Sequence, residues 1–184
     1  MDHTYALPAS PTQVCDVSST TPSSESDTHE CPVCLQAPQL PIKLPCNHIF
    51  CFLCAKGFAN QHGRCAYCRA EIPIGYMQLP TVVPRNSEGG SDADRKYQWF
   101  YAGRNGWWQF ENRHCEELEE ALQKGDSQYE LQVSGFMYVI DLHQMVQYRK
   151  DRPGRTRRIK RDIISAPRKG VAGLRDDLIN GSLI

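Results

Sequence analysis

Seven cysteines and one histidine form the part of the 184-residue sequence best suited to chemistry, because they come in close pairs. In chain order they are Cys31, Cys34, Cys46, His48, Cys51, Cys54, Cys65 and Cys68. A Cys-x2-Cys loop turns the backbone so that two thiolates can bind one tetrahedral ion, and four such ligands complete a structural zinc site. Eight ligands therefore predict two zinc ions, which would stabilise a segment with little apolar core of its own.

The rest of the sequence favours zinc over disulfide bonds as the use of these cysteines. The first thirty residues contain five acidic residues, no lysine or arginine and no apolar run, so we expect no secretory signal peptide. No later apolar run is long enough to cross a bilayer, so we expect no membrane partner. We therefore expect a cytoplasmic protein, with the nucleus as a second location, where thiols stay reduced. Cys15 and Cys115 stand outside the paired spacing, and we expect neither to act as a nucleophile.

The order of the ligands, with the single histidine in fourth place, resembles the RING finger that has three cysteines, one histidine and four cysteines. That resemblance implies a cross-brace in which alternate pairs share an ion. The first zinc would be held by Cys31, Cys34, Cys51 and Cys54, and the second by Cys46, His48, Cys65 and Cys68. RING domains hold an E2 enzyme charged with ubiquitin so that a lysine can attack the thioester, which is catalysis by positioning without a covalent intermediate. An unrelated structural zinc domain is the alternative.

The resemblance also implies three contacts to E2 or ubiquitin, at Val33, Phe58 and Arg69. Val33 matches the apolar patch of the family, Phe58 stands where many RING fingers have a tryptophan, and Arg69 follows the last ligand as the family's linchpin arginine does. Alternatively, Val33 and Phe58 are core residues and Arg69 is solvated. Ala66 replaces the proline found in the last Cys-x2-Cys of strong RING ligases, so we expect weak basal affinity for E2.

Composition divides the chain into five segments. Residues 1–29 are rich in serine, threonine and proline and have too few apolar residues to offset the entropy of ordering, so we expect a disordered tail. The zinc domain covers residues 30–73, and proline and glycine mark a linker over residues 74–95. A second domain covers residues 96–163, and the C-terminal extension, residues 164–184, is expected to be mostly irregular.

The second domain shows short aromatic and apolar runs around one amphipathic segment. We expect a hairpin with an Asn-Gly turn, a helix that ends at Gly125, and three more strands. Strands are predicted at 97–101, 107–111, 129–133, 136–141 and 145–149, and the helix at 116–124. Leu118, Ala121 and Leu122 would form the buried face of the helix. The predicted fold class is α+β: a small two-zinc cross-brace finger followed by a curved antiparallel sheet packed on one helix.

These aromatic runs resemble the WWE domain, with Trp99, Trp108 and either Glu111 or a nearby acid as the residues that give it its name. A RING finger, a short linker and a WWE domain, in this order over residues 30–174, resemble the Iduna-type RING–WWE ubiquitin ligases. That family binds iso-ADP-ribose, the internal unit of poly(ADP-ribose). The resemblance implies a ligase that recognises poly(ADP-ribosyl)ated proteins, is activated allosterically by the ligand, and directs their ubiquitination and degradation.

By the same resemblance, seven side chains would contact iso-ADP-ribose: Lys56, Tyr101, Trp108, Tyr138, Gln147, Arg157 and Lys169. The aromatic residues would form walls around the adenine, Gln147 would hydrogen-bond the adenine or a ribose, and the basic residues would pair with phosphates. Lys56 belongs to the zinc domain, so its contact would connect the ligand to both domains. Alternatively, Trp108 is a core residue and Lys56 is a solvated one.

Two function classes other than a ligase are compatible with these patterns. One is a non-enzymatic poly(ADP-ribose) reader whose RING finger is only structural. The other is a nucleic-acid-binding zinc protein, suggested by residues 149–161, where eight basic residues stand against one acid although the net charge of the chain is zero. No groove-entering helix is evident, so we expect no specific DNA or RNA partner. The expected partners are a ubiquitin-charged E2, poly(ADP-ribose) with its protein conjugates, and tankyrase-type polymerases, for which residues 85–90 are a loose peptide match.

Overall fold

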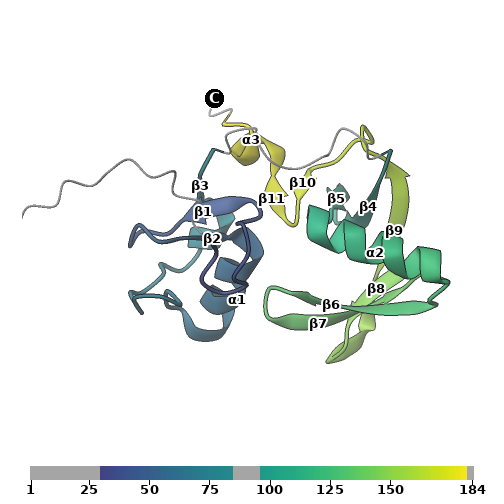
Figure 1. Ribbon diagram of the computed structural model, residues 1–184, viewed down its shortest axis with the longest axis horizontal. Coiled ribbons are helices and arrows are strands. Elements are labelled where there is room, and N and C mark those ends of the chain that lie inside the picture. The colour runs from purple at the N-terminus through teal and green to yellow at the C-terminus, as the bar shows by residue number, and fades with distance from the viewer. Residues whose placement is uncertain (1–29, 85–95, 182–184) are drawn as a thin grey trace, which may run out of the picture.

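The computed structural model of the protein describes residues 30–84 and 96–181, which form two domains in contact (Figure 1). The tail expected to be disordered (1–29), which contains Cys15, and the peptide match at 85–90 lie outside the described residues. Among the described residues, no helix is both long and apolar enough to cross a bilayer.

The first domain combines a small antiparallel sheet with one longer helix. Its elements are β1 (Pro41–Lys43), β2 (Ile49–Cys51), α1 (Phe52–His62), the 3-10 helix η1 (Tyr76–Gln78) and β3 (Thr81–Val82), with strand order β2-β1-β3. Helix α1 ends where Gly63 adopts a φ of 64°, a left-handed conformation that glycine takes without strain. Buried Ile42, Phe50 and Phe52 form an apolar core beside the cysteines.

The first domain extends beyond residue 73, where the linker was expected to begin. Val82 pairs with Ile42, and Thr81 with Lys43, in the sheet of that domain. The hydroxyl of Tyr76 donates a hydrogen bond to the Lys43 carbonyl. The first part of the predicted linker therefore completes the sheet. Strands of two or three residues carry no periodic pattern, which is why the sequence did not reveal them.

The second domain is a curved sheet with a helix packed against it (Figure 1). Its elements are β4 (Tyr97–Gly103), β5 (Gly106–Gln109), α2 (Asn112–Lys124), β6 (Gln128–Val133), β7 (Phe136–Asp141), β8 (Val146–Arg149), β9 (Arg152–Ile163), β10 (Gly170–Val171), β11 (Leu174–Arg175) and α3 (Asp176–Ile179). The strand order is β11-β10-β5-β4-β9-β8-β7-β6. The expected hairpins are present, with Gly103 paired to Gly106 and Val133 to Phe136.

Helix α2 supplies one side of the core of the second domain. It begins at Asn112, one turn before the predicted start, and ends at Gly125 as predicted, with a φ of 79°. Cys115, Leu118 and Ala121 are buried against Trp99 and other apolar side chains of the sheet. Leu122 was expected on this buried face, but it is 42% exposed. The buried face of the helix follows Cys115 and Leu118, at a spacing of three residues, so Leu122 lies at the edge of this face.

Strand β9 was absent from the sequence prediction, which treated most of this stretch as a basic run. It pairs with β4 on one side and with β8 on the other, so it joins the two halves of the sheet. Its first seven residues are all exposed, and Ile159 is its one buried residue. A strand without an alternation of apolar and polar residues gives no period-two signal, and only its pairing identifies it.

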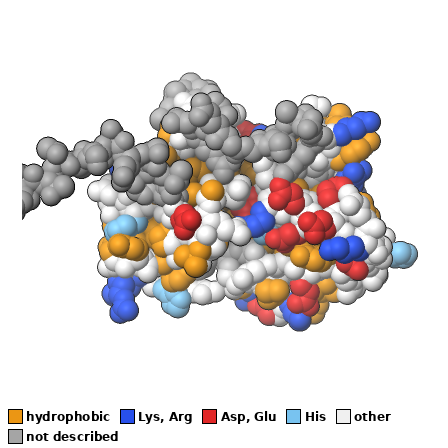
Figure 2. Space-filling view, in the orientation of Figure 1, with side chains coloured by type: hydrophobic (Ala, Val, Ile, Leu, Met, Phe, Trp, Pro, Cys, Tyr) orange, Lys and Arg blue, Asp and Glu red, His pale blue; other side chains and the backbone are white. Residues whose placement is uncertain are grey.

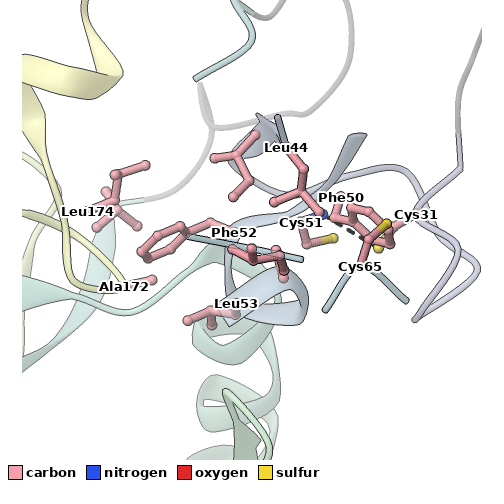
Figure 3. Packing of buried hydrophobic residues seen from close by; sticks show 13 residues of the cluster. Cys31, Leu44, Phe50, Cys51, Phe52, Leu53, Cys65, Ala172 and Leu174 are labelled. Atoms are coloured by element: carbon pink, nitrogen blue, oxygen red, sulfur yellow. Dashed lines mark hydrogen bonds between the residues drawn. The ribbon is translucent and has the colours of Figure 1, made fainter. Parts of the chain in front are cut away.

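The C-terminal extension is mostly ordered, contrary to the irregular structure expected for residues 164–184. Val171 of β10 pairs in parallel with Gln109 of β5, and β10 also pairs antiparallel with β11. Val171, Ala172 and Leu174 belong to the same buried cluster as the core of the first domain. Figure 3 shows Leu174 and Ala172 next to Phe52 of the first domain. The extension therefore connects the two domains through apolar packing.

Polar contacts add to this connection between the domains. Gln61 Nε2 on α1 donates to the carbonyl oxygen of Gly135 at 3.0 Å, and Arg113 Nη1 on α2 donates to Gln36 Oε1 at 2.8 Å. Gly57 permits the approach, because a Cβ at this position would lie 3.1 Å from the backbone nitrogen of Gly135. The turn between β6 and β7 thus lies directly on α1.

Candidate functional site

Eight ligand atoms of the first domain gather into two groups of four, in each of which all atoms lie within 4.8 Å of one another. One group is Cys31, Cys34, Cys51 and Cys54, and the other is Cys46, His48, Cys65 and Cys68. The pairs interleave along the chain, as a cross-brace requires. His48 Nδ1 lies 3.3 Å from Cys46 Sγ and 3.8 Å from Cys65 Sγ, so Nδ1 is the ring nitrogen that faces the second site.

The electrostatics of these groups fit a bound dication. The pKa of Cys51 is raised to about 12, first by its hydrogen bond with the Cys31 sulfur, so the sulfurs do not all ionise without a nearby cation. Backbone N–H groups stabilise the thiolates, since Gln39 donates to Cys51 Sγ at 3.2 Å and Cys51 donates to Cys31 Sγ at 3.5 Å. Four sulfurs, or three sulfurs and one imidazole, are ligand sets of tetrahedral zinc. The residues therefore fit two zinc ions.

A pocket of about 230 Å³ lies between the two domains, and five of the seven side chains expected to contact the ligand line it. They are Lys56, Tyr101, Tyr138, Gln147 and Arg157. Lys56 comes from α1 of the first domain, whereas the other four come from strands β4, β7, β8 and β9 of the second. Gln147 is directly paired with Arg157, so their side chains lie on the same face of the sheet. Residues far apart in the sequence thus meet in one cavity.

The polar ends of Lys56 and Tyr101, which both line this pocket, lie close to Gly173. A methyl group on Gly173 would lie 3.4 Å from Lys56 Nζ and 3.8 Å from the Tyr101 hydroxyl. Burial lowers the pKa of Lys56, and the nearby guanidinium of Arg157 lowers it further. Burial likewise raises the pKa of Tyr101. Two cations face a partly buried space there, which is an environment that favours an anionic ligand.

The other two expected contacts, Trp108 and Lys169, do not line the pocket. Trp108 is half-buried and pairs with Tyr101 across β4 and β5, so its side chain lies on the same face of the sheet as Tyr101. Lys169 Nζ lies 5.0 Å from the centroid of the Trp108 ring. These two residues lie near the turn of the β4–β5 hairpin, where Lys169 approaches Gly106, and neither lines the cavity.

The glutamate that supports a tryptophan is Glu119, not Glu111. Trp99 Nε1 donates to Glu119 Oε1 at 2.8 Å, and the guanidinium of Arg161 donates to both oxygens of Glu119 at 2.7 and 3.0 Å. This carboxylate ties α2 to β4 and β9. Glu119 is therefore the acid that contacts Trp99 directly.

Family models match both domains. The model of the WWE domain matches residues 97–161, and the model of the zinc finger, C3HC4 type (RING finger), matches residues 27–73. The chain therefore contains a RING finger followed by a WWE domain. The RING finger holds the two interleaved metal groups, and the WWE domain is the curved sheet packed on α2. The predicted fold class and the two zinc sites are therefore confirmed.

Similar proteins include several with ubiquitin-ligase names. E3 ubiquitin-protein ligase RNF146-A from Bos taurus is 50% identical over 148 residues, which are 80% of this chain and 43% of the relative. E3 ubiquitin-protein ligase RNF146 from Homo sapiens is 50% identical over 149 residues, 80% of this chain and 42% of the relative. The protein of the same name from Ailuropoda melanoleuca is 48% identical over 157 residues, 85% and 44% of the two chains. This chain spans less than half the length of these curated relatives.

The three side chains expected to contact E2 or ubiquitin are divided between two places on the RING finger. Val33 and Phe58 are half-buried and line one cleft of about 540 Å³, whose other wall belongs to the WWE domain and includes Arg113 and Glu117. Arg69 is exposed and lies outside this cleft. An apolar patch and a separate exposed cation are thus both available on the RING finger, and their roles stay predictions.

Two buried polar residues of the pocket wall were missed by the sequence analysis as site residues. Glu111 is 1% exposed and lines both the cleft and the pocket; its Oε1 accepts a hydrogen bond from Arg113 Nη2 at 2.9 Å and lies 3.6 Å from His114 Nε2. Its Oε2 is buried and has no hydrogen-bond partner among the described residues. Burial lowers the pKa of His114, which keeps this side chain neutral. Charged residue types normally indicate solvent exposure, so no signal in the sequence marked these two as buried.

Proposed function

We propose that this chain is a RING-type E3 ubiquitin ligase whose WWE domain binds the iso-ADP-ribose unit of poly(ADP-ribose). The observation that carries the proposal is the pocket between the domains, where Lys56 of the RING finger meets Tyr101, Gln147 and Arg157 of the WWE domain. An adenosine needs an aromatic wall and a few polar contacts, and its phosphates need cations. Tyrosines, a buried amide and two cations supply this combination in one cavity. The names of the relatives support the ligase activity.

The proposed ligand activates the ligase allosterically because it would touch both domains. A ligand that bridges Lys56 and Arg157 favours the arrangement in which the RING finger and the WWE domain are docked. Coupling between two sites is reciprocal, so E2 and iso-ADP-ribose should strengthen each other's binding by the same factor. A weak basal affinity for E2, which is expected from Ala66, is one that binding of the ligand could increase.

The proposed reaction is transfer of ubiquitin from E2 to a lysine of a poly(ADP-ribosyl)ated protein, which marks that protein for degradation. The RING finger would position the thioester and form no covalent bond itself. Val33 and Phe58 would receive the E2 through apolar contacts, and the planar guanidinium of Arg69 would bond E2 and ubiquitin together. Tankyrase-type polymerases are proposed partners, and the cytoplasm and nucleus are the proposed locations.

Two measurements test the proposal together. Calorimetry with iso-ADP-ribose should show that Arg157→Ala and Gln147→Ala weaken binding by about ten- to a hundredfold, since each removes a polar contact to the ligand. Lys124→Ala is the matched control, because Lys124 is exposed on α2 and pairs only with Glu120 at 3.4 Å among the interactions described. Ubiquitin chain formation with a purified E2 should rise when iso-ADP-ribose is added, and Lys56→Ala should reduce this rise.

Each outcome separates the ligase from a non-enzymatic reader. Binding of iso-ADP-ribose without discharge of ubiquitin from the E2 would leave the chain as a poly(ADP-ribose) reader with a structural RING finger. Chain formation that is the same with and without saturating iso-ADP-ribose would leave the WWE domain as a recruitment module. Unchanged affinity in Arg157→Ala would remove this residue from the site.

A further inference from the structure

A second groove opens directly from the pocket. It has a volume of about 500 Å³ and lies along the hairpin formed by β8 and β9. It shares four lining residues with the pocket: Tyr138, Gln147, Arg149 and Arg157. Beyond them it is lined by Arg152 and Arg155, near the hairpin's turn. The pocket and this groove, which we call the hairpin groove, are therefore continuous.

The strand register places several polar side chains along the hairpin groove. Arg157 of β9 is paired with Gln147 of β8, and Arg149 lies two residues further along β8, so these three side chains are on the same face of the sheet. Arg155 lies where the register of the β8–β9 pairing shifts, and it lines the groove together with Arg157. The guanidinium carbon of Arg149 lies 3.6 Å from the centroid of the Phe136 ring, which fixes its place at the boundary between pocket and groove.

The hairpin groove is strongly cationic. Four arginines line it and no acidic residue does. The nearby Asp151 is bound by Arg149, whose Nε and Nη2 lie 2.9 and 2.6 Å from its two oxygens. Arg152 is 4.0 Å from the same carboxylate. Arg155 is exposed and lines the groove, and it belongs to none of the ion pairs described within residues 30–84 and 96–181.

The opposite charge gathers elsewhere on the molecule. Figure 2 shows acidic side chains clustered over α2, and the sequence of that helix contains four glutamates. A zero net charge thus conceals one acidic surface and one basic groove. A polyanion would be attracted to the groove and repelled from the surface over α2.

We infer that the hairpin groove binds the pyrophosphate of the polymer unit next to the one held in the pocket. This inference rests on the proposed function, since the polymer must first place one internal unit between Lys56 and Arg157. The chain of poly(ADP-ribose) then leaves the pocket through the wall that the two cavities share. Each following unit carries two phosphates, and planar guanidinium groups bind phosphate oxygens with two parallel hydrogen bonds. The protein therefore reads more than one unit and binds a longer chain more tightly.

The experiment compares a single unit with a chain. The full chain and its Arg155→Ala and Arg152→Ala variants are titrated with iso-ADP-ribose and with a length-fractionated poly(ADP-ribose) oligomer, with concentrations expressed per internal unit. The unaltered protein should bind the oligomer more tightly than iso-ADP-ribose. Each variant should lose about tenfold in affinity for the oligomer and change less than about twofold for iso-ADP-ribose. Lys124→Ala, which removes one positive charge outside the groove, should change neither.

Arg155→Lys separates geometry from charge. Lysine keeps the positive charge and loses the planar fork, so this variant should recover only part of the affinity for the oligomer. Full recovery would show that charge alone is sufficient and would remove bidentate binding from the inference.

Three results would overturn the inference. The first is an equal loss of affinity for iso-ADP-ribose and for the oligomer in Arg155→Ala, which would place this residue in the pocket. The second is no change for either ligand. The third is competition by inorganic polyphosphate or single-stranded RNA that is as strong as competition by the oligomer at equal salt, which would make the groove a general anion surface. If the unaltered protein did not bind iso-ADP-ribose at all, the proposed function itself would fail.

Discussion

Leu174 is the side chain that carries the C-terminal extension into the core of the RING finger, and Leu174→Ala tests whether this packing holds the two domains together. Leu174 is 1% exposed and packs in one cluster with Phe52 and Val171 (Figure 3). It lies on β11, whose strand partner β10 pairs in turn with β5 of the WWE domain. Its removal should therefore weaken the contact between the domains.

The expected loss is about 2–5 kcal/mol, the usual range for replacing a fully buried leucine by alanine. Each 1.4 kcal/mol is a factor of ten, so the equilibrium constant of the folded, docked state should fall by about thirtyfold to several thousandfold. The three tryptophans, Trp99, Trp107 and Trp108, all lie in the WWE domain, so their fluorescence reports on this domain alone. Release of zinc reports on the RING finger.

Urea unfolding should show nearly coincident transitions for the two probes in the unaltered protein and separated, earlier transitions in Leu174→Ala. Leu79→Ala is the matched control, because Leu79 is 69% exposed in the RING finger and its truncation should change stability by less than about 0.5 kcal/mol. If Leu174→Ala and Leu79→Ala lowered the free energy of unfolding equally, the role given to the C-terminal extension would be wrong.

A zinc ligand, a buried histidine and a buried hydrogen bond provide three further tests. Chelation of zinc, or Cys51→Ala, should unfold the RING finger, because its ligands lose the ion that joins them. A folded RING finger that contains no zinc by elemental analysis would contradict the assignment of the zinc sites. Burial lowers the pKa of His114 from 6.5, so the unfolded chain takes up the proton first as the pH falls. Stability measured by urea unfolding should therefore decrease below about pH 6.5, by at most ~1.4 kcal/mol per pH unit. His114→Gln should lessen this dependence on pH, and an unaltered dependence would refute the cause. Glu119→Ala should lower the free energy of unfolding by about 1–3 kcal/mol, since Trp99 Nε1 and Arg161 lose a hydrogen-bond acceptor at 2.8 and 2.7 Å. An unchanged urea midpoint would show that water replaces the lost carboxylate.

The zinc domain was the most predictable part of the structure, because its ligands are close in sequence. The spacing of Cys31 and Cys34, and of the later pairs, restricts where the thiolates can point, and the family resemblance supplied the interleaved pairing. The hairpin around Gly103 was equally accessible, since an Asn-Gly turn between aromatic runs has one common structure. Local chemistry decided both features.

Contacts between distant segments were hidden from the sequence. The parallel pairing of Val171 with Gln109 joins residues that are far apart in the chain, and the two-residue strand β10 has no pattern of its own. Strand β9 was missed because its run of arginines lacks the alternation of apolar and polar residues that usually marks a strand. In the pocket, Glu111 and His114 are buried at the cavities between the two domains, whereas residue type alone indicates exposure.

The return of the chain to the RING finger has a consequence for fragments of the protein. The polypeptide passes from the RING finger to the WWE domain once, between residues 84 and 96, and then comes back through β10 and β11. Leu174 would therefore keep the halves associated even without the covalent connection, with Gln61 and Gly135 as a second attachment. Residues 1–84 and 96–184, produced as separate polypeptides, should therefore bind each other and re-form the contact between the domains. The composite pocket would form only on reassembly, so iso-ADP-ribose should promote the pairing of the two pieces.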